Sequence, residues 1–202
     1  MLLKWLRCTV ADRDGFADRD GFADGQLGWS ELTAVPGFVT QLGGWDDDGT
    51  AHVLALWTDH VRYDAFMDGP HQKLAAAQSS CITGTERLVL PEVAFIEDFT
   101  VGPGLLRLAH GRVRPERLQH FLDAQVNVWN PGMSAAPGFT GGVFARSGTS
   151  FLVATRWASA AAHAAYQSDV FPALRDRAAH GADLEDFAGY QVELVPDWSV
   201  LT

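Results

Sequence analysis

The chain has 202 residues, of which 47% are hydrophobic and 20% charged, and its formal net charge is −10. This composition is typical of a globular protein, and the length suits one substantial domain or two small ones. The negative charge disfavours nucleic acid and anionic membranes as partners, and two cysteines without a Cys-x-x-Cys pair disfavour a disulfide framework or a structural zinc ion. No apolar run is long enough for a signal peptide or a membrane span, so we expect a cytoplasmic protein.

The first hundred residues predict the element order β-α-β-β-α-β. Residues 2–10 alternate as in a strand, and the apolar positions of residues 22–32 have helical spacing. Between them, the hexapeptide Ala-Asp-Arg-Asp-Gly-Phe occurs twice in succession. Its Asp-x-Asp-Gly pattern is how a calcium-binding loop begins, but the other ligands are missing, so we interpret the duplication as a longer approach to the helix. The later elements are a hairpin over 36–57, a helix over 58–67 that resumes over 71–78, and a strand over 88–99 with a break at Pro91.

The same order begins again after the Val-Gly-Pro-Gly sequence at residues 101–104, which we take as the boundary between two repeats. The predicted domains are therefore residues 1–100 and 105–202. The elements of the second repeat are a strand over 105–113, a helix over 114–129 that ends at Asn-Pro-Gly, a hairpin from residue 137, a helix over 159–179 interrupted at 171–172, and a strand over 190–195.

The hairpin is the part of the repeat that is best preserved. A Pro-Gly-Phe turn precedes each hairpin and a tryptophan ends it, so that Phe38 and Trp57 recur as Phe139 and Trp157 about 100 residues later. Each hairpin also has a Gly-Thr turn between its two apolar runs. The chain therefore contains two copies of one structural unit.

A β-α-β-β-α-β unit forms a four-stranded antiparallel sheet with both helices on one face, which is the ferredoxin-like arrangement. The other face of the sheet is apolar and needs a cover, because a patch of that size is a liability in water. The second copy supplies such a cover. We therefore expect an α+β protein in which two ferredoxin-like repeats pack sheet to sheet as a pseudo-dimeric α/β barrel with the helices outside, and a monomer with internal pseudo-twofold symmetry.

The Pro-Gly-Phe turn after an aromatic-bearing helix, the hairpin, the strand-ending Trp and the His- and Tyr-bearing helix together resemble the dimeric α/β-barrel superfamily. Within it, the resemblance is greatest to domains of the antibiotic-biosynthesis-monooxygenase type. The sequences Lys-Trp-Leu-Arg-Cys at 4–8, Gln-Leu-Gly-Gly-Trp at 41–45 and Trp-Asn-Pro-Gly-Met at 129–133 resemble an uncharacterised bacterial family of tandem proteins, a domain of unknown function. The resemblance covers nearly the whole chain.

Monooxygenases of this superfamily place their site between the sheet and the helices of one unit, and use an Asn on the first strand, a Trp, and a His on the second helix. The resemblance implies a cofactor-independent oxygenase that acts on a small aromatic or polyketide-like molecule, although neither first strand here contains an Asn. We favour the second repeat because it is richer in polar candidates. The candidate catalytic residues are His163, Trp157 and Tyr166, and the candidate substrate-binding residues are Arg107, His110, Asn127, Trp129, Trp57 and His71.

The alternative is a member without catalytic activity that binds a small ligand or is purely structural, since a strand-ending Trp is commonly a packing residue. Haem is a further alternative, because His71 or His163 could serve as its axial ligand. No metal is expected, since no pair of histidines has the spacing of a metal-binding helix. A cavity of about 300 Å³ or more beside Trp157, His163 and Tyr166 would favour the enzyme, whereas close packing without a cavity would exclude it.

Overall fold

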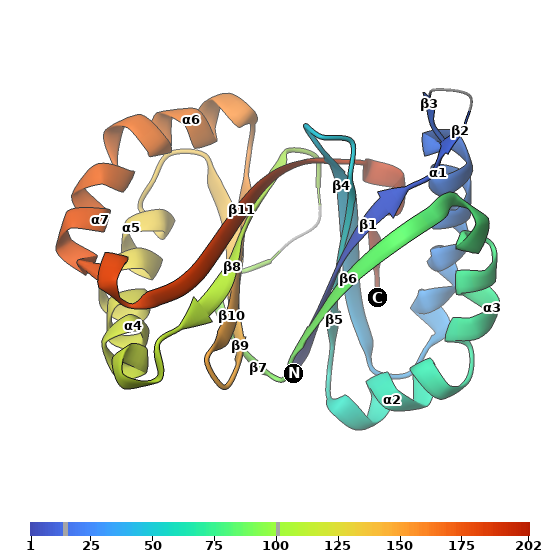
Figure 1. The fold of residues 1–202 in the computed structure, drawn as a ribbon, viewed down its shortest axis with the longest axis horizontal. Coiled ribbons are helices and arrows are strands. Elements are labelled where there is room, and N and C mark those ends of the chain that lie inside the picture. Colours follow the sequence, from blue (N-terminus) through green and yellow to red (C-terminus); the bar gives the residue numbers. More distant parts are fainter. Residues whose placement is uncertain (14–15, 100–101) are drawn as a thin grey trace. The chain divides into compact units, whose positions relative to one another are not determined.

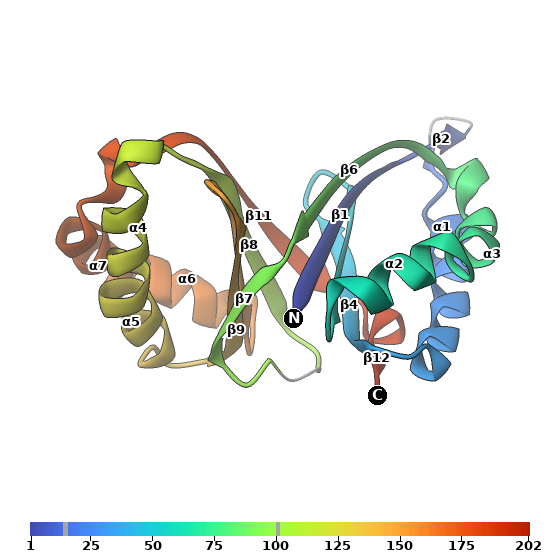
Figure 2. The same ribbon diagram turned by 90° about the horizontal axis from the view of Figure 1, so that it is seen from below.

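The computed structural model describes residues 1–13, 16–99 and 102–202, and they form two compact units. Unit 1 comprises Met1–Glu92 together with Val192–Thr202, and unit 2 comprises Val93–Gln191. Both units contain an antiparallel sheet with helices on one face (Figures 1 and 2). The predicted α+β class with two ferredoxin-like repeats is confirmed.

The sheet of unit 1 has the strand order β6-β1-β5-β4, in which the first and third strands of the repeat are central, as in a ferredoxin-like fold. Helices α1, α2 and α3 cover one face of this sheet (Figure 2). The elements are β1 (Leu2–Val10), β2 (Asp12–Arg13), β3 (Phe16–Ala17), α1 (Arg19–Leu27) with a 3-10 extension (Gly28–Ala34), β4 (Phe38–Asp46), β5 (Ala51–Trp57), α2 (His60–Asp68), α3 (His71–Ala76), β6 (Ile82–Leu90) and, at the C-terminus, β12 (Val200–Leu201).

Unit 2 repeats this order as β11-β8-β10-β9, and β7 is added beside β9. Helices α4 to α7 lie on one face of its sheet (Figure 1). The elements are β7 (Glu92–Glu97), β8 (Leu105–Val113), α4 (Leu118–Ala124), a π-helical turn (Gln125–Trp129), α5 (Asn130–Ser134), β9 (Phe139–Ser147), β10 (Ser150–Trp157), α6 (Ala160–Asp169), α7 (Phe171–Ala178) and β11 (Leu184–Leu194).

The first and third strands of the repeat pair in the same register in each unit. In unit 1 the first strand starts with Leu2 opposite Trp57, and in unit 2 it starts with Leu105 opposite Trp157. The repeated tryptophan therefore marks equivalent positions in the two sheets. Any residue of one first strand can be matched to a residue of the other by counting from this pair.

The turns and helix starts of the two units also use the same chemistry. Gly37 and Gly138 have φ values of +84° and +82°, a left-handed conformation that strongly favours glycine in each Pro-Gly turn. The helix that follows each hairpin begins with a side-chain cap. Asp59 Oδ1 accepts a hydrogen bond from the amide of Arg62, and Ser159 Oγ accepts one from the amide of Ala162.

Several predicted boundaries are wrong. The closing strands begin at Ile82 and Leu184 rather than at residues 88 and 190, because most of the residues that follow these two are exposed and are held by backbone pairing instead of by apolar burial. The break at Pro91 is confirmed. The helix predicted to end at Asn130 continues to Ser134, because Pro131 stands in the first turn of α5, where proline is tolerated.

The compact units do not end where the sequence repeats end. Strand β7 lies before the predicted boundary at residues 101–104 but pairs with β9 of unit 2. Residues Val192–Leu194 pair with β4 of unit 1, and Trp198 packs beside Trp45 at a ring-centroid distance of 5.1 Å. The duplicated hexapeptide includes residues 14–15, which lie outside the described residues, so its role stays a prediction.

In the part of the chain that the structure describes, no helix is both long and apolar enough to cross a membrane.

Candidate functional site

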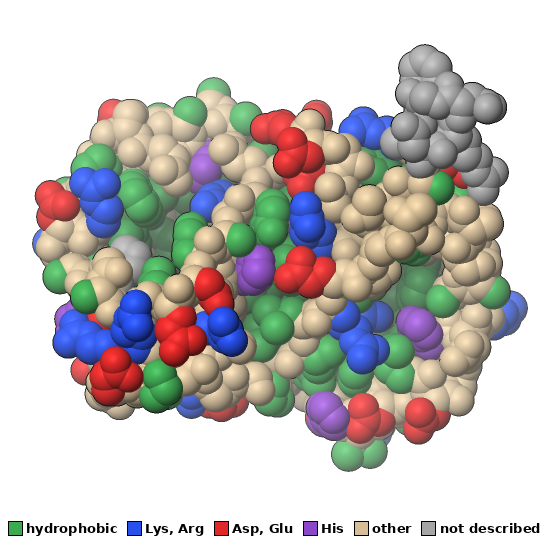
Figure 3. All heavy atoms as spheres, viewed as in Figure 1, with side chains coloured by type: hydrophobic (Ala, Val, Ile, Leu, Met, Phe, Trp, Pro, Cys, Tyr) green, Lys and Arg blue, Asp and Glu red, His purple; other side chains and the backbone are tan. Residues whose placement is uncertain are grey.

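Each unit contains a cavity between its sheet and its helices, where the superfamily resemblance places a site. The cavity of unit 2 has a volume of about 550 Å³, and that of unit 1 about 200 Å³. The larger one exceeds the lower limit of about 300 Å³ that is usual for small-molecule pockets. Figure 3 shows a recess floored by hydrophobic side chains on the face of unit 2, with charged side chains at its edge.

The walls of the unit 2 cavity are rich in aromatic side chains. Trp129, Phe151 and Phe171 line it together with Trp157 and Tyr166. Trp129 comes from the π-helical turn, a rare distortion that is common at functional sites. Planar apolar walls of this kind suit a flat, ring-containing molecule.

Arg107 is one of two arginines that line the unit 2 cavity, the other being Arg175. It extends from β8, and its Nη1 donates a hydrogen bond to the backbone oxygen of Tyr190 at 3.2 Å. Among the described residues this is its one hydrogen bond, and no carboxylate forms an ion pair with it. Burial lowers the pKa of Arg107, although a guanidinium stays charged at neutral pH. The remaining N–H groups can therefore bind an anionic or carbonyl oxygen of a ligand.

His163 and Tyr166 face the same cavity from α6. His163 is only 2% exposed, and its Nε2 lies 3.3 Å from Nε2 of Gln167. Burial lowers the pKa of His163 and the positive charge of Arg107 lowers it further, while a hydrogen bond with the Gln191 side chain has the opposite effect. Burial raises the pKa of Tyr166 to about 12. At neutral pH, His163 is thus an uncharged imidazole that can accept a proton, and Tyr166 is a hydroxyl donor.

Trp157 has a structural role in this wall. Its side chain is 1% exposed, its Nε1 donates to Thr155 Oγ1 at 3.1 Å, and its ring packs against Tyr166 and His163 at centroid distances of 4.7 and 5.4 Å. The indole N–H is therefore already used within the protein. Trp157 orients the two polar residues of α6 and presents an apolar surface to the cavity.

The structure brings five predicted site residues together in unit 2 and separates the others. Arg107, Trp129, Trp157, His163 and Tyr166 all line the larger cavity, whereas Trp57 and His71 line the cavity of unit 1. His110 and Asn127 are not among the described residues that line either one.

The positions of His110 and Asn127 follow from the geometry of their elements. His110 is three residues after Arg107 on β8, so it points to the opposite face of the sheet, where it stacks on Tyr190 at 5.8 Å. Asn127 is exposed, and its Nδ2 donates to the backbone oxygen of Asp123 on the helix surface. Neither residue is placed to bind a ligand in the cavity.

Sequence reasoning missed Lys4 as a site residue. Lys4 pairs with Ala55 and Arg107 pairs with Thr155, each two residues before the repeated tryptophan. The two cavities therefore carry a cation at the same position of the first strand. An alignment of the repeats on Trp57 and Trp157 would have revealed this signal.

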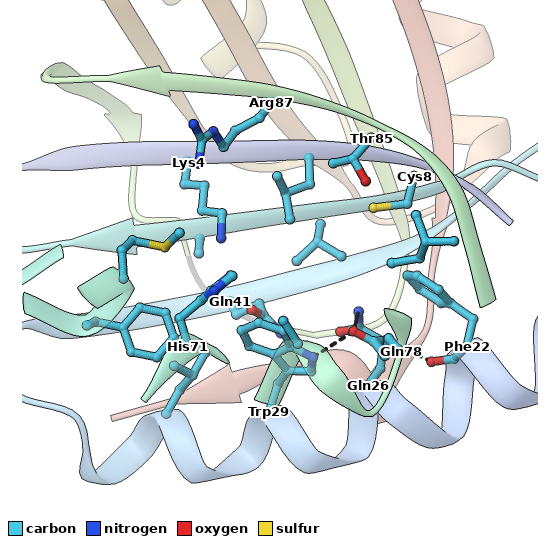
Figure 4. A pocket seen from close by; sticks show the side chains of 18 of the residues that line it. Lys4, Cys8, Phe22, Gln26, Trp29, Gln41, His71, Gln78, Thr85 and Arg87 are labelled. Carbon is cyan, nitrogen blue, oxygen red and sulfur yellow. Dashed lines mark hydrogen bonds between the residues drawn. The ribbon is translucent and has the colours of Figure 1, made fainter. Parts of the chain in front are cut away.

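A buried amide network forms one end of the unit 1 cavity. Gln78 Oε1 accepts hydrogen bonds from Trp29 Nε1 at 2.8 Å and from Gln26 Nε2 at 3.3 Å, and Gln78 Nε2 donates to the backbone oxygen of Phe22. Figure 4 shows this network at one end of the cavity, while Lys4 enters from β1 at the other. The unit 1 cavity thus has polar groups at its two ends and apolar side chains in its middle (Figure 4).

No group of three or more His, Cys, Asp or Glu side chains that could hold a metal occurs within residues 1–13, 16–99 and 102–202. For haem, His163 would have to exchange its contact with Gln167 or Gln191 for iron.

Solved structures resemble this chain over nearly its whole length. A candidate monooxygenase from Lactobacillus acidophilus NCFM superposes with a TM-score of 0.73, covering 100% of this chain and 98% of its own at 14% identity. An anthrone oxidase-like protein gives 0.70, with 96% and 91% coverage at 13% identity. A Listeria monocytogenes ferredoxin-fold protein related to antibiotic biosynthesis monooxygenases gives 0.50, with 95% coverage of both chains at 12% identity. At such identities the likeness shows the fold alone, and it defines the class of proteins that carry two ferredoxin-like repeats in one chain.

Sequence relatives identify the family within that class. Residues 2–87 match the family model of a domain of unknown function, DUF4937. The uncharacterized protein YdbC of Bacillus subtilis (strain 168) is 30% identical over 114 residues, which are 52% of this chain and 91% of YdbC. The chain therefore belongs to the family of YdbC and DUF4937, as the resemblance of its sequence predicts.

Proposed function

We propose that unit 2 is a cofactor-independent oxygenase site for a small, weakly acidic aromatic or polyketide-like molecule. The observation that carries this proposal is the aromatic cavity of about 550 Å³ that holds an unpaired cation, Arg107, and an uncharged base, His163. A second supporting observation is the fold, which the chain shares with proteins named as monooxygenases and as anthrone oxidase-like.

The residues can perform the chemistry without a resident redox group because the substrate supplies the electrons. His163 accepts a proton from an acidic ring CH₂ or phenol, and the weak contact with Gln167 is the one that the substrate replaces. Arg107 stabilises the negative charge that develops on the substrate oxygen. The aromatic walls hold the substrate flat and exclude water.

The overall conversion is balanced with dioxygen as the only co-reactant. The substrate anion forms a C–O bond to O₂, and the resulting peroxide takes back the proton from His163. Loss of water breaks the O–O bond, so that a ring CH₂ and O₂ become a ring C=O and H₂O. The carbon is oxidised and the dioxygen is fully reduced.

An anthrone is the appropriate first probe, because it is planar, its CH₂ group is acidic, and one structural neighbour is named for this class. Oxygen uptake and quinone absorbance are measured with the wild-type protein, Arg107→Met and His163→Gln. We expect protein-dependent oxidation that falls by at least about a hundredfold in both variants. Arg114→Gln, which changes an exposed arginine outside the cavity lining, is the control and should keep the wild-type rate.

The other outcomes decide against the oxygenase. Saturable binding without oxygen uptake would assign unit 2 to the alternative, a site that binds a ligand without changing it. A Soret band that develops with haemin and is lost in His163→Gln would replace the oxygenase with a haem-binding protein. Oxidation that is equally fast in Arg107→Met would show that the cavity is not where the reaction occurs.

A further inference from the structure

Lys4 is a buried cation in the lining of the unit 1 cavity. Lys4 is 6% exposed, and its side chain forms no ion pair with any described residue. Its Nζ lies 5.9 Å from the ring centroid of Trp29 and 6.0 Å from that of Tyr63. These aromatic faces attract a cation only weakly compared with a carboxylate. A buried lysine that lacks an anion is costly, which suggests that an anion comes from outside the chain.

A second donor lies across the sheet from Lys4. Lys4 on β1 and Gln41 on β4 are both register partners of Ala55 on β5, so the three residues form one row on the same face. Gln41 is 3% exposed, and its Nε2 has no hydrogen-bond partner among the described residues. Because Ala55 is small, space is left between the two donors. Figure 4 shows Lys4 extending into the cavity toward Gln41 and His71.

The rest of the lining has the charge and polarity expected of an anion site. Arg87 adds a second cation at the exposed edge of the cavity, and no Asp or Glu occurs among the described lining residues. This is notable in a chain whose formal net charge is −10. The middle of the cavity is apolar, with Trp57 and Phe66 among its walls.

We propose that the cavity of unit 1 is a second ligand site, which binds a small carboxylate with a single apolar ring or a short aliphatic chain. The carboxylate lies over Ala55 and accepts hydrogen bonds from Lys4 and Gln41, and the apolar part fills the space beside Trp29 and Trp57. A volume of about 200 Å³ restricts the ligand to this size. The apolar walls favour a monoanion over a phosphate dianion, which would need more donors. The proposal does not rest on oxygenase activity in unit 2.

The test uses the full chain and benzoate as the probe, with the indole N–H of Trp29 and the side-chain amide of Gln41 as NMR reporters of this cavity. We expect saturable shifts of both signals with benzoate, and at least about tenfold weaker binding of benzamide, which has the same shape without the charge. Lys4→Met should weaken the binding of benzoate at least about tenfold, and Gln41→Leu should weaken it by a few-fold. Lys73→Met, which removes an exposed lysine, should bind like the wild type.

Several results would overturn the proposal. Equal binding of benzoate and benzamide would show that the charge of Lys4 is not used, and this comparison needs no variant. Unchanged benzoate binding by Lys4→Met would place the anion elsewhere. Inorganic phosphate that binds more tightly than benzoate would make the site one for phosphate. The absence of saturable shifts with benzoate would show that the cavity is not a carboxylate site.

Discussion

Replacing Lys4 with methionine is expected to stabilise the protein. Burial is the main cause that lowers the pKa of Lys4 from 10.5 to about 8; the positive charge of Arg87 contributes to this change and Cys8 opposes it. Since one pKa unit corresponds to about 1.4 kcal/mol, the charged side chain costs about 3 kcal/mol of unfolding free energy near pH 7. Methionine has a similar length and carries no charge, so Lys4→Met should recover about 2–3 kcal/mol.

The sign of the pH dependence provides an independent check. The folded pKa lies below the unfolded one, so the cost of Lys4 is fully present below about pH 8 and disappears as the pH rises toward 10.5. Between about pH 7 and about pH 9.5, the wild type should recover about 2 kcal/mol from this group, and the advantage of Lys4→Met should shrink to about 1 kcal/mol.

Urea unfolding followed by tryptophan fluorescence at both pH values measures these differences. Lys73→Met is the matched control, since Lys73 is exposed and forms only a surface ion pair with Glu31 at 3.2 Å. Its effect should stay within about 0.5 kcal/mol at either pH. A Lys4→Met protein that is no more stable than the wild type near pH 7, or whose advantage is the same at both pH values, would refute the reasoning.

Two further substitutions test other buried groups. Burial lowers the pKa of His71 to about 4, below its unfolded value of 6.5, so its contribution to stability is present above pH 6.5 and is lost as the pH falls toward 4. The substitution His71→Phe places the residue found at position 171 of the other repeat. Between about pH 7.5 and about pH 5.5, the unfolding free energy of this variant should fall by about 1 kcal/mol less than that of the wild type, after allowance for solvent screening. Urea unfolding measures both values, and equal losses would contradict the prediction. The fully buried carboxylate of Asp183 accepts hydrogen bonds from Arg117 at 2.7 Å and His120 at 2.6 Å. Asp183→Asn should lower the free energy of unfolding by about 2 kcal/mol in the same assay, and an unchanged unfolding midpoint would show that these bonds contribute little.

The hairpins could be predicted from the sequence because hydrophobic burial dictates their apolar strands. Trp57 and Trp157 recur at equivalent positions, and both side chains are 1% exposed. The closing strands were predicted too short because their first halves are mostly exposed, and their few large apolar residues, Ile82, Leu184 and Phe187, do not form an alternating pattern. Trp198 was missed for a related reason, since it belongs to a short C-terminal segment without periodicity.

The site was predicted in part, and its gaps have physical causes. Aromatic residues near a repeated tryptophan are found by spacing, which is why Trp129 and Tyr166 were identified. Arg107 and His110 were grouped as polar residues of one strand, although an odd spacing places them on opposite faces. Lys4 was overlooked because a lysine on a strand is normally exposed, and only the register against β5 shows that it is buried.

The exchange of terminal segments between the sequence repeats limits how the protein can be divided. A fragment cut at residues 101–104 would remove β7 from the unit that it completes, and it would take Trp198 away from the core it fills in unit 1. Neither half of the gene thus encodes a whole unit. A chain with a single copy of the repeat would have to obtain these segments from a second chain, so duplication and fusion would turn a concentration-dependent assembly into one that folds within a single molecule.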